Sequence, residues 1–170
     1  FVFPSRLGWM ALRTDGEAAR KLTFGHPSRR AALEAIGAGP TAGLPTAGWQ
    51  ADLIRRLRAF SEGQAVDFRD VPVDLDAMTP LRKKILGRCR QIPYGATATY
   101  GQLAARAGVP RAARAVGNCM AANPLPLVIP CHRVVPASGP PGAYSAPGGA
   151  ATKTRLLAME SKRGPANRVV

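Results

Sequence analysis

A cysteine and a histidine stand next to each other in an apolar stretch of the chain. Residues 127–135 read Leu-Val-Ile-Pro-Cys-His-Arg-Val-Val, with Cys131 and His132 at the centre. A thiol becomes a nucleophile when a base removes its proton, and that base must itself be oriented by an acceptor. Taken alone, such a pair is more often structural than reactive, because an apolar setting raises the pKa of a thiol.

Carboxylates that could orient His132 are scarce. Residues 77–159, which are 83 in number, contain no Asp or Glu, so Glu160 is the nearby acid and Asp76 is the remote alternative. We expect the Cys-His segment to be an extended strand, in which adjacent side chains point to opposite faces. Cys131 and His132 would then need a water molecule between them to exchange a proton.

Three helices are predicted ahead of this site. Thr79, followed by a proline, has the form of an N-cap and first turn. Thr99 and Gln102 match a capping box that opens a short second helix. Gly-Val-Pro joins that helix to a third one over residues 110–122. The last two helices form a candidate helix-turn-helix, for which an ordinary helical hairpin is the alternative.

The third helix is thin and carries basic side chains. Arg111 and Arg114 lie three positions apart, on neighbouring positions of one helical face. The residues between and after them are alanines and a glycine, which allow a close approach. The helix could therefore enter a groove of nucleic acid, or it could pack tightly against the protein core.

Basic residues are concentrated in the C-terminal half. The chain has 24 Lys+Arg and 10 Asp+Glu, a formal net charge of +14. Residues 1–75 hold 10 basic and 8 acidic residues, whereas residues 76–170 hold 14 basic and 2 acidic residues. Such a half attracts a polyanion over long range, and nucleic acid is the first candidate. Genomic composition or thermal adaptation is the alternative explanation.

The N-terminal half predicts a small α+β unit. Two β-type runs around a Thr-Asp-Gly turn predict a hairpin, and helices are expected after Ser28 and over residues 49–60. Residues 66–75 are expected to be extended. We therefore predict two domains, an α+β domain over residues 1–75 and a domain with the candidate site over residues 76–170.

Composition excludes several classes of protein. With 46% hydrophobic residues the chain can bury a core and is not disordered. No apolar run approaches the 18 residues of a membrane span, and the first residues do not resemble a signal peptide. Three cysteines without a Cys-x-x-Cys pair predict neither a disulfide framework nor a zinc site. We expect no metal and a reducing compartment, the cytoplasm or the nucleus of a eukaryote.

Seven short motifs follow one another from the middle of the chain to its last helix. They read Ile92-Pro-Tyr-Gly, Thr99-Tyr-Gly-Gln-Leu-Ala, Ala113-Arg-Ala-Val-Gly, Asn123-Pro, Pro130-Cys-His-Arg-Val, Gly142-Ala-Tyr-Ser and Lys153-Thr-Arg-Leu-Leu-Ala-Met-Glu160. In order and spacing the set resembles the 6-O-alkylguanine-DNA alkyltransferase family, strongly over residues 66–160 and only architecturally before them. The resemblance implies an α+β fold, with a small ribonuclease-H-like α/β domain followed by a mainly helical domain. That second domain would carry a helix-turn-helix and an active-site cysteine loop.

The resemblance implies a repair protein that moves an alkyl group from the O6 atom of guanine to its own cysteine. Cys131 would accept the group, and His132 would draw off its proton through a water, oriented by Glu160. Asn123 would hold the active-site turn, and Tyr100 would protonate the departing base. The thioether product is stable, so the protein would act once.

The resemblance also implies that double-stranded DNA with an alkylated guanine is the partner. The protein would be a monomer that needs no cofactor. Arg114 would fill the place of the nucleotide rotated out of the duplex, and the small residues beside it would let the helix enter the minor groove. Arg111, Ala113 and Tyr100 would also lie at the DNA. The positions that match the guanine pocket are Met120, Val134, Tyr144 and Ser145, with Tyr144 contributing its ring and Ser145 a hydrogen bond towards O6.

The chain departs from the family pattern in two places. Leu81 stands where the family usually has Phe, and the segment between Tyr144 and Lys153 is about two residues longer than usual. Three other functions are alternatives. A Cys-His hydrolase normally separates the two residues in sequence, and a redox-sensing cysteine would use the same thiol. A catalytically silent protein that senses alkyl lesions would replace the cysteine, which is intact here.

Overall fold

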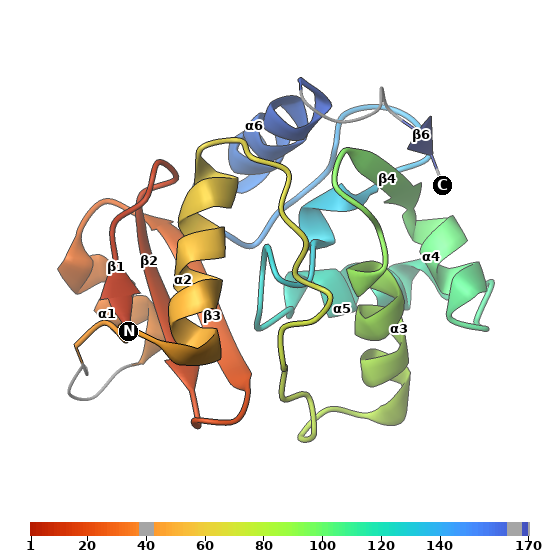
Figure 1. Ribbon diagram of the computed structural model, residues 1–170. Helices are drawn as coiled ribbons and strands as arrows, with labels where there is room; N and C mark the ends of the chain where they lie inside the picture. The colour runs from red at the N-terminus through yellow and green to blue at the C-terminus, as the bar shows by residue number, and fades with distance from the viewer. Residues whose placement is uncertain (38–42, 163–167, 170) are drawn as a thin grey trace.

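The computed structural model describes residues 1–37, 43–162 and 168–169, and it has a mixed α and β fold (Figure 1). The N-terminal half contains an antiparallel sheet of strands β1 (Val2–Phe3), β2 (Trp9–Thr14) and β3 (Ala19–His26), in that order. The predicted hairpin is β2–β3. Its turn is closed by the Asp15 carboxylate, which accepts hydrogen bonds from the backbone N–H groups of Glu17 and Ala18 at 3.0 and 2.8 Å.

Helices cover both faces of this sheet. Side chains alternate between the faces of a strand, so Ala11 points to one side while Met10 and Leu12 point to the other. Helix α1 (Arg29–Ile36), capped by Ser28 as predicted, packs on the Ala11 face. Helix α2 (Gly48–Ser61) packs on the opposite face, close to the predicted 49–60 (Figure 1).

The C-terminal half is mainly helical and has one small parallel sheet. Its helices are α3 (Pro80–Arg90), α4 (Tyr100–Arg106), α5 (Ala113–Ala121), α6 (Gly149–Ser161) and the 3₁₀ helix η1 (Cys131–Arg133). The strands are β4 (Ala96–Thr99), β5 (Val134–Val135) and β6 (Arg168–Val169), in the order β5-β4-β6. Because β4 leads directly into α4 and β5 follows η1, the sheet fixes α4 beside the Cys-His segment.

The helix starts that the sequence predicts are confirmed at Thr79 and Thr99. The Thr99 hydroxyl accepts from the Gln102 N–H at 3.1 Å, and the Gln102 side chain accepts from the Thr99 N–H at 2.7 Å, a complete capping box. The third helix begins later than expected, at Ala113. Residues 110–112 form a turn, closed by the Ala112 N–H on the Val109 carbonyl at 2.9 Å, so Arg111 precedes the helix.

The prediction that residues 66–75 are extended is wrong at residues 69–71, where the chain turns and bends. This connector segment links the two halves, and within it only Val73 forms a β-bridge, with Ala19. Arginine side chains donate hydrogen bonds to backbone carbonyls of this segment. Arg56 of α2 donates to the Asp67 carbonyl at 2.8 Å, and Arg90 of α3 donates to the Phe68 carbonyl at 2.8 Å.

The buried core is continuous across the two halves. One apolar cluster includes Phe24 and Phe60 of the N-terminal half, Phe68 of the connector, and Leu103 and Cys131 of the C-terminal half. Burial of such surface stabilises a fold by about 25 cal/mol per Å². The halves are therefore packed together through apolar side chains. Among the residues described, no helix is long and apolar enough to span a membrane.

The capping box at the start of α4 is testable by thermodynamics. We expect Thr99→Ala to lower the free energy of unfolding by about 1 kcal/mol, because the Gln102 N–H loses its acceptor. Thr154→Ala is the matched control, since this exposed hydroxyl only donates to the Ala150 carbonyl within α6 and alanine favours a helix. Urea unfolding of both variants measures the difference. Equal losses would show that the box contributes nothing.

Candidate active site

The turn that leads to the cysteine is held by one asparagine. Asn123 is buried, and its amide nitrogen donates to the Ile129 carbonyl at 2.8 Å and to Cys131 Sγ at 3.1 Å. Its side-chain oxygen accepts from the Leu125 N–H at 3.1 Å. Leu127 adopts a φ of 74°, which a non-glycine residue rarely does, at the tip of this turn. Asn123 thus forms hydrogen bonds with both the turn and the thiol.

The prediction of a strand at Cys131 and His132 is wrong. The two residues lie in the 3₁₀ helix η1, which turns through three residues. Successive side chains are therefore rotated by about a third of a turn instead of pointing to opposite faces. The Cys131 N–H bonds the Ile129 carbonyl at 2.8 Å and the Arg133 N–H bonds the Pro130 carbonyl at 2.9 Å. The thiol and the imidazole therefore do not point to opposite faces, as they would on a strand.

Glu160 is the partner of His132, and Asp76 is not. His132 Nε2 lies 2.8 Å from Glu160 Oε1, and both side chains are buried. Asp76 is exposed and forms an ion pair with Lys83 at 2.7 Å. The other ring nitrogen of His132, Nδ1, is buried and has no hydrogen-bond partner among the described residues. With Nε2–H donated to Glu160, Nδ1 is left as the nitrogen that can accept a proton.

Arg133 completes the environment of Glu160. Its Nε donates to Oε2 at 3.0 Å and its Nη2 donates to Oε1 at 2.9 Å, and the Gly95 N–H donates to Oε2 at 3.1 Å. Burial by itself would raise the pKa of Glu160, but His132 and Arg133 outweigh it and hold the pKa at about 2. The carboxylate is therefore ionised at any physiological pH.

The histidine and the thiol are both held in their neutral forms. Burial lowers the pKa of His132, and the attraction of Glu160 does not compensate for it. Burial also raises the pKa of Cys131, against the hydrogen bond from Asn123. A neutral imidazole beside a protonated thiol is a base with its proton donor still in place. This pair suits a reaction in which the proton leaves the sulfur as the sulfur attacks.

Cys131 lines a cavity of about 290 Å³. Of the residues expected at the guanine pocket, Met120, Tyr144 and Ser145 line it. Val134 does not, because its side chain is fully buried in β5. Gly117 and Ala121 of α5 form part of the wall, so this helix separates the cavity from its own exposed face. The cavity can hold a planar group of the size of a nucleobase against the thiol.

Lys153 is a site residue that the sequence did not single out. Its ammonium group donates to the Val134 carbonyl at 2.6 Å and to the Tyr100 hydroxyl at 3.4 Å, and it lies 5.6 Å from the centre of the Tyr100 ring. The residue is 1% exposed, and this burial lowers the pKa of its amine. Its position seven residues before Glu160, two turns along one face of α6, is the signal that could have identified it.

The residues expected at DNA lie on one exposed edge near the cavity. Arg111, Ala113 and Arg114 are exposed, the first in the turn before α5 and the other two in its first turn. Tyr100, the first residue of α4, is half-buried and lines the cavity. Helices α4 and α5 pack against each other. Tyr100 and α5 therefore both border the cavity, and the two arginines lie at the N-terminal end of α5 or just before it.

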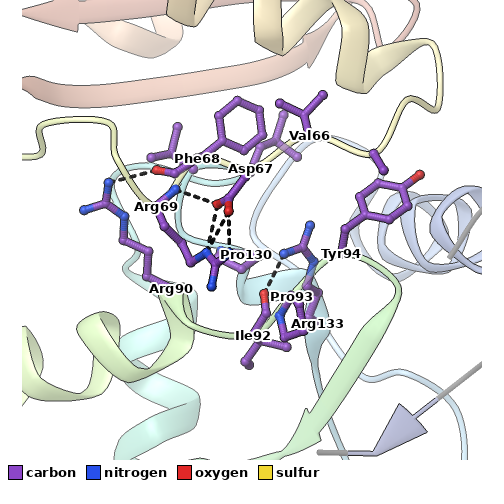
Figure 2. A pocket seen from close by; sticks show the side chains of 13 residues that line it. Val66, Asp67, Phe68, Arg69, Arg90, Ile92, Pro93, Tyr94, Pro130 and Arg133 are labelled. Atoms are coloured by element: carbon purple, nitrogen blue, oxygen red, sulfur yellow. Dashed lines mark hydrogen bonds and ion pairs between the residues drawn. The ribbon is translucent and has the colours of Figure 1, made fainter. Parts of the chain in front are cut away.

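A second cavity, of about 270 Å³, lies behind the active-site turn (Figure 2). It is lined by Pro130 and Arg133 from the turn and by the connector. Its charged groups already have partners: Arg69 Nε lies 2.8 Å from Asp67 Oδ2, and Arg133 Nη1 donates to the Ile92 carbonyl at 2.7 Å. Neither the thiol nor His132 lines this second cavity, so it is not the reaction site. We call it the back cavity.

Glu160 can be tested through protein stability. We expect Glu160→Gln to lower the free energy of unfolding at pH 7 by about 3 kcal/mol, because the buried Arg133 loses its counter-charge. Glu34→Gln is the control, since its pair with Arg30 is exposed and contributes little. Urea unfolding at pH 7 compares them. A loss for Glu160→Gln no larger than that of the control would contradict the buried network.

The C-terminal half matches a known family. Residues 80–162 match the family described as 6-O-methylguanine DNA methyltransferase, DNA binding domain. The methylated-DNA–protein-cysteine methyltransferase of Mycobacterium tuberculosis (strain ATCC 25618 / H37Rv) is 38% identical over 123 residues, which are 72% of this chain and 72% of that protein. The human protein of the same name is 56% identical over 72 residues, 42% of this chain and 34% of its own.

Solved structures extend the similarity over both halves. The crystal structure of the Mycobacterium tuberculosis O6-methylguanine methyltransferase has a TM-score of 0.78 and 32% identity, and covers 97% of this chain and 93% of its own. The structure of the Mycobacterium tuberculosis OGT in complex with DNA has a TM-score of 0.75 and 33% identity, with 96% and 93% covered. Because a relative of that name is 38% identical over 72% of both chains, and residues 80–162 match the family itself, the chain belongs to the 6-O-methylguanine-DNA methyltransferase family.

Proposed function

We propose that this protein repairs DNA by transferring the alkyl group from the O6 atom of guanine to Sγ of Cys131, once per molecule. The observation that carries the proposal is the position of the thiol. Cys131 lies in the wall of a cavity of nucleobase size, next to a buried histidine that a carboxylate orients. A neutral, buried imidazole with one free nitrogen is the base that such a thiol requires.

The transfer is a displacement at the alkyl carbon. The Cys131 proton passes through a water to His132 Nδ1, and the sulfur forms a bond to the carbon while the bond from that carbon to O6 breaks. The electron pair of the broken bond remains on the guanine. Glu160 stabilises the imidazolium that forms, as it is ionised and 2.8 Å from the ring. The resulting thioether is stable, so the protein is consumed in the reaction.

The departing guanine anion needs a proton, and we propose that Tyr100 gives it, since Tyr100 lines the cavity. Burial raises the pKa of Tyr100, so the phenol remains protonated until the departing guanine takes its proton. The Lys153 ammonium 3.4 Å from the phenol oxygen would stabilise the charge that develops there. Tyr144 would contribute its ring to the base, and Ser145 a hydrogen bond towards O6, since both line the cavity.

A guanine inside a duplex cannot reach this cavity, so the nucleotide must rotate out of the stack. We propose that α4 and α5 form a helix-turn-helix whose second helix enters the minor groove. Arg114 would fill the vacated place, with Arg111, Ala113 and Tyr100 beside it. The small residues around Arg114 allow the close approach, and the basic C-terminal half attracts the phosphates. A protein that repairs any sequence does not need the more informative major groove.

The finer description of the fold follows the same proposal. The N-terminal sheet with a helix on each face would be a ribonuclease-H-like domain over residues 1–75, and residues 76–170 would be the alkyltransferase domain. We propose that the protein acts as a monomer in the cytoplasm, or in the nucleus of a eukaryote. A silent lesion sensor is the alternative, and the presence of Cys131 against the cavity disfavours it.

Transfer itself is tested with a duplex oligonucleotide that carries a labelled methyl group on guanine O6. We expect one methyl group per protein molecule, found on Cys131 by peptide mass analysis. Cys131→Ala should abolish transfer, and His132→Ala should slow it by at least about 100-fold, the usual contribution of a positioned base. Cys89→Ala is the matched control and should react normally, because Cys89 is buried and does not line the cavity. Wild-type binding without transfer would favour the lesion sensor.

Base rotation is tested by comparing two substrates. Arg114→Ala should reduce the repair rate of duplex DNA by about tenfold or more, because unstacking costs a few kcal/mol, but leave the reaction with free alkylated guanine unchanged. Arg55→Ala, an equally exposed arginine in α2, is the control and should affect neither. Equal losses on both substrates would mean that Arg114 acts at the cavity and not on the duplex.

A further inference from the structure

The proposed base is covered by an aromatic ring from the other half of the molecule. Phe60, in the last turn of α2, lies with its ring centre 6.1 Å from that of His132, at an interplanar angle of 61°. Both side chains are 0% exposed. The N-terminal half therefore reaches the proposed base through Phe60, as it reaches the cavity residue Tyr144 through Phe24, although none of its residues lines the thiol cavity.

Phe60 is the ring on which several others converge. Phe68 of the connector lies 6.0 Å from it at 61°, and Tyr94 lies 6.1 Å from it at 82°. Figure 2 shows Phe68, Tyr94 and Arg133 around the back cavity, where the Arg133 guanidinium lies 5.7 Å from the centre of the Tyr94 ring. The aromatic cluster thus touches both His132 and the arginine that holds Glu160. Edge contacts of this kind add to apolar burial and favour a defined geometry.

The end of α2 is held firmly enough to position a ring. The Tyr94 hydroxyl donates to the Gly63 carbonyl at 3.0 Å, just after the helix. The Ser61 hydroxyl accepts from the Arg6 N–H at 3.1 Å and donates to the Arg58 carbonyl at 2.7 Å. At Gly63, whose φ is +84°, a Cβ would lie 3.4 Å from the Met159 side chain of α6. The end of α2 therefore abuts the helix that carries Glu160.

A hydrocarbon ring affects an imidazole in two ways. The phenyl ring cannot form a hydrogen bond with the imidazole. The orientation of His132 therefore depends on the hydrogen bond between its Nε2 and Glu160 and on apolar contact with Phe60. The phenyl ring also excludes bulk water, which would otherwise stabilise the imidazolium. The charged and titratable groups that act on His132 are Glu160 and Lys153 from α6 and Arg133 from η1. Glu160 favours protonation of the imidazole more strongly than each of the two cations opposes it. Exclusion of water is therefore the main effect that keeps the ring neutral.

We propose that Phe60 is a positioning residue for His132: its ring fixes the imidazole against Glu160 and shields that side of the imidazole from bulk water, so that Nδ1 stays free to take the Cys131 proton through the bridging water. The inference rests on the proposed function, because it assigns His132 as the base of that reaction. It gives the N-terminal half a defined part in the chemistry. Phe60 does not touch the substrate cavity and acts only through His132.

The protonation of His132 can be observed directly, since the chain has only two histidines. In protein labelled with ¹³C-histidine, NMR titration gives two signals, and His26→Gln assigns the remaining one to His132. We expect the His132 midpoint of the wild type to lie below the ordinary value for histidine. In Phe60→Leu, which removes the ring but keeps an apolar side chain, the midpoint should rise by about one pH unit as water gains access.

The rate of methyl transfer should follow the same shift. His132 works only when neutral, so a higher midpoint removes activity from the acid side. Well below both midpoints Phe60→Leu should react about tenfold more slowly than the wild type, as one pKa unit is a tenfold change in the neutral fraction. At alkaline pH the two rates should agree within about threefold. The acid limb of the rate profile should move by the same amount as the NMR midpoint.

Phe3→Leu is the matched control, because Phe3 is also fully buried in the N-terminal core but has its ring against Arg58. It should lose stability without moving either midpoint. If Phe60→Leu does not fold, Phe60→Met carries the same test, since its flexible side chain fills irregular space. A folded Phe60 variant with an unchanged His132 midpoint would overturn the inference. A wild type that transfers no methyl group would instead overturn the proposed function, and the NMR result would still report on Phe60.

Discussion

The structure depends on one buried carboxylate. Glu160 is 1% exposed, and taking an ion out of water costs several kcal/mol unless its partners compensate. Arg133, His132 and the Gly95 N–H supply that compensation from two different segments. Because Arg133 and His132 are adjacent in η1, satisfying Glu160 also fixes the segment that holds Cys131. The position of the thiol is therefore set by an interaction one residue away from it in sequence.

Both halves of the chain contribute to that arrangement. The connector at residues 66–75 is tied to α2 through Arg56 and to α3 through Arg90, and it places Phe68 against Phe60. Phe60 in turn covers His132, which brings the last turn of α2 to the active site. The apolar core runs through these contacts without interruption. A boundary near residue 75 therefore divides the chain into two segments, but side chains from both segments pack around the site.

The sequence predicts local features better than distant ones. Capping at Thr79 and Thr99 and the β2–β3 hairpin depend on neighbours in the chain, and all three are confirmed. The scarcity of acids pointed to Glu160, but the choice against Asp76 required the structure. The 3₁₀ conformation at Cys131 was missed because apolar flanking residues suit a strand equally well. The contact of Phe60 with His132 is not predictable from the sequence, because only folding brings the two rings together, whereas Lys153 shares a helical face with Glu160 and its spacing could have indicated it.

The absence of acids from residues 77–159 has consequences inside and outside the molecule. On the surface it leaves the segment around the exposed Arg111 and Arg114 without a carboxylate that would repel phosphates. In the interior it leaves Arg133 with Glu160 as its carboxylate partner, so the pair cannot rearrange with a competing neighbour in that segment. The lack of acids in residues 77–159 thus favours both the attraction of DNA and a single arrangement of Arg133 and Glu160 around His132. Placing an acid beside α5 would weaken the first effect, and placing one near Arg133 would weaken the second.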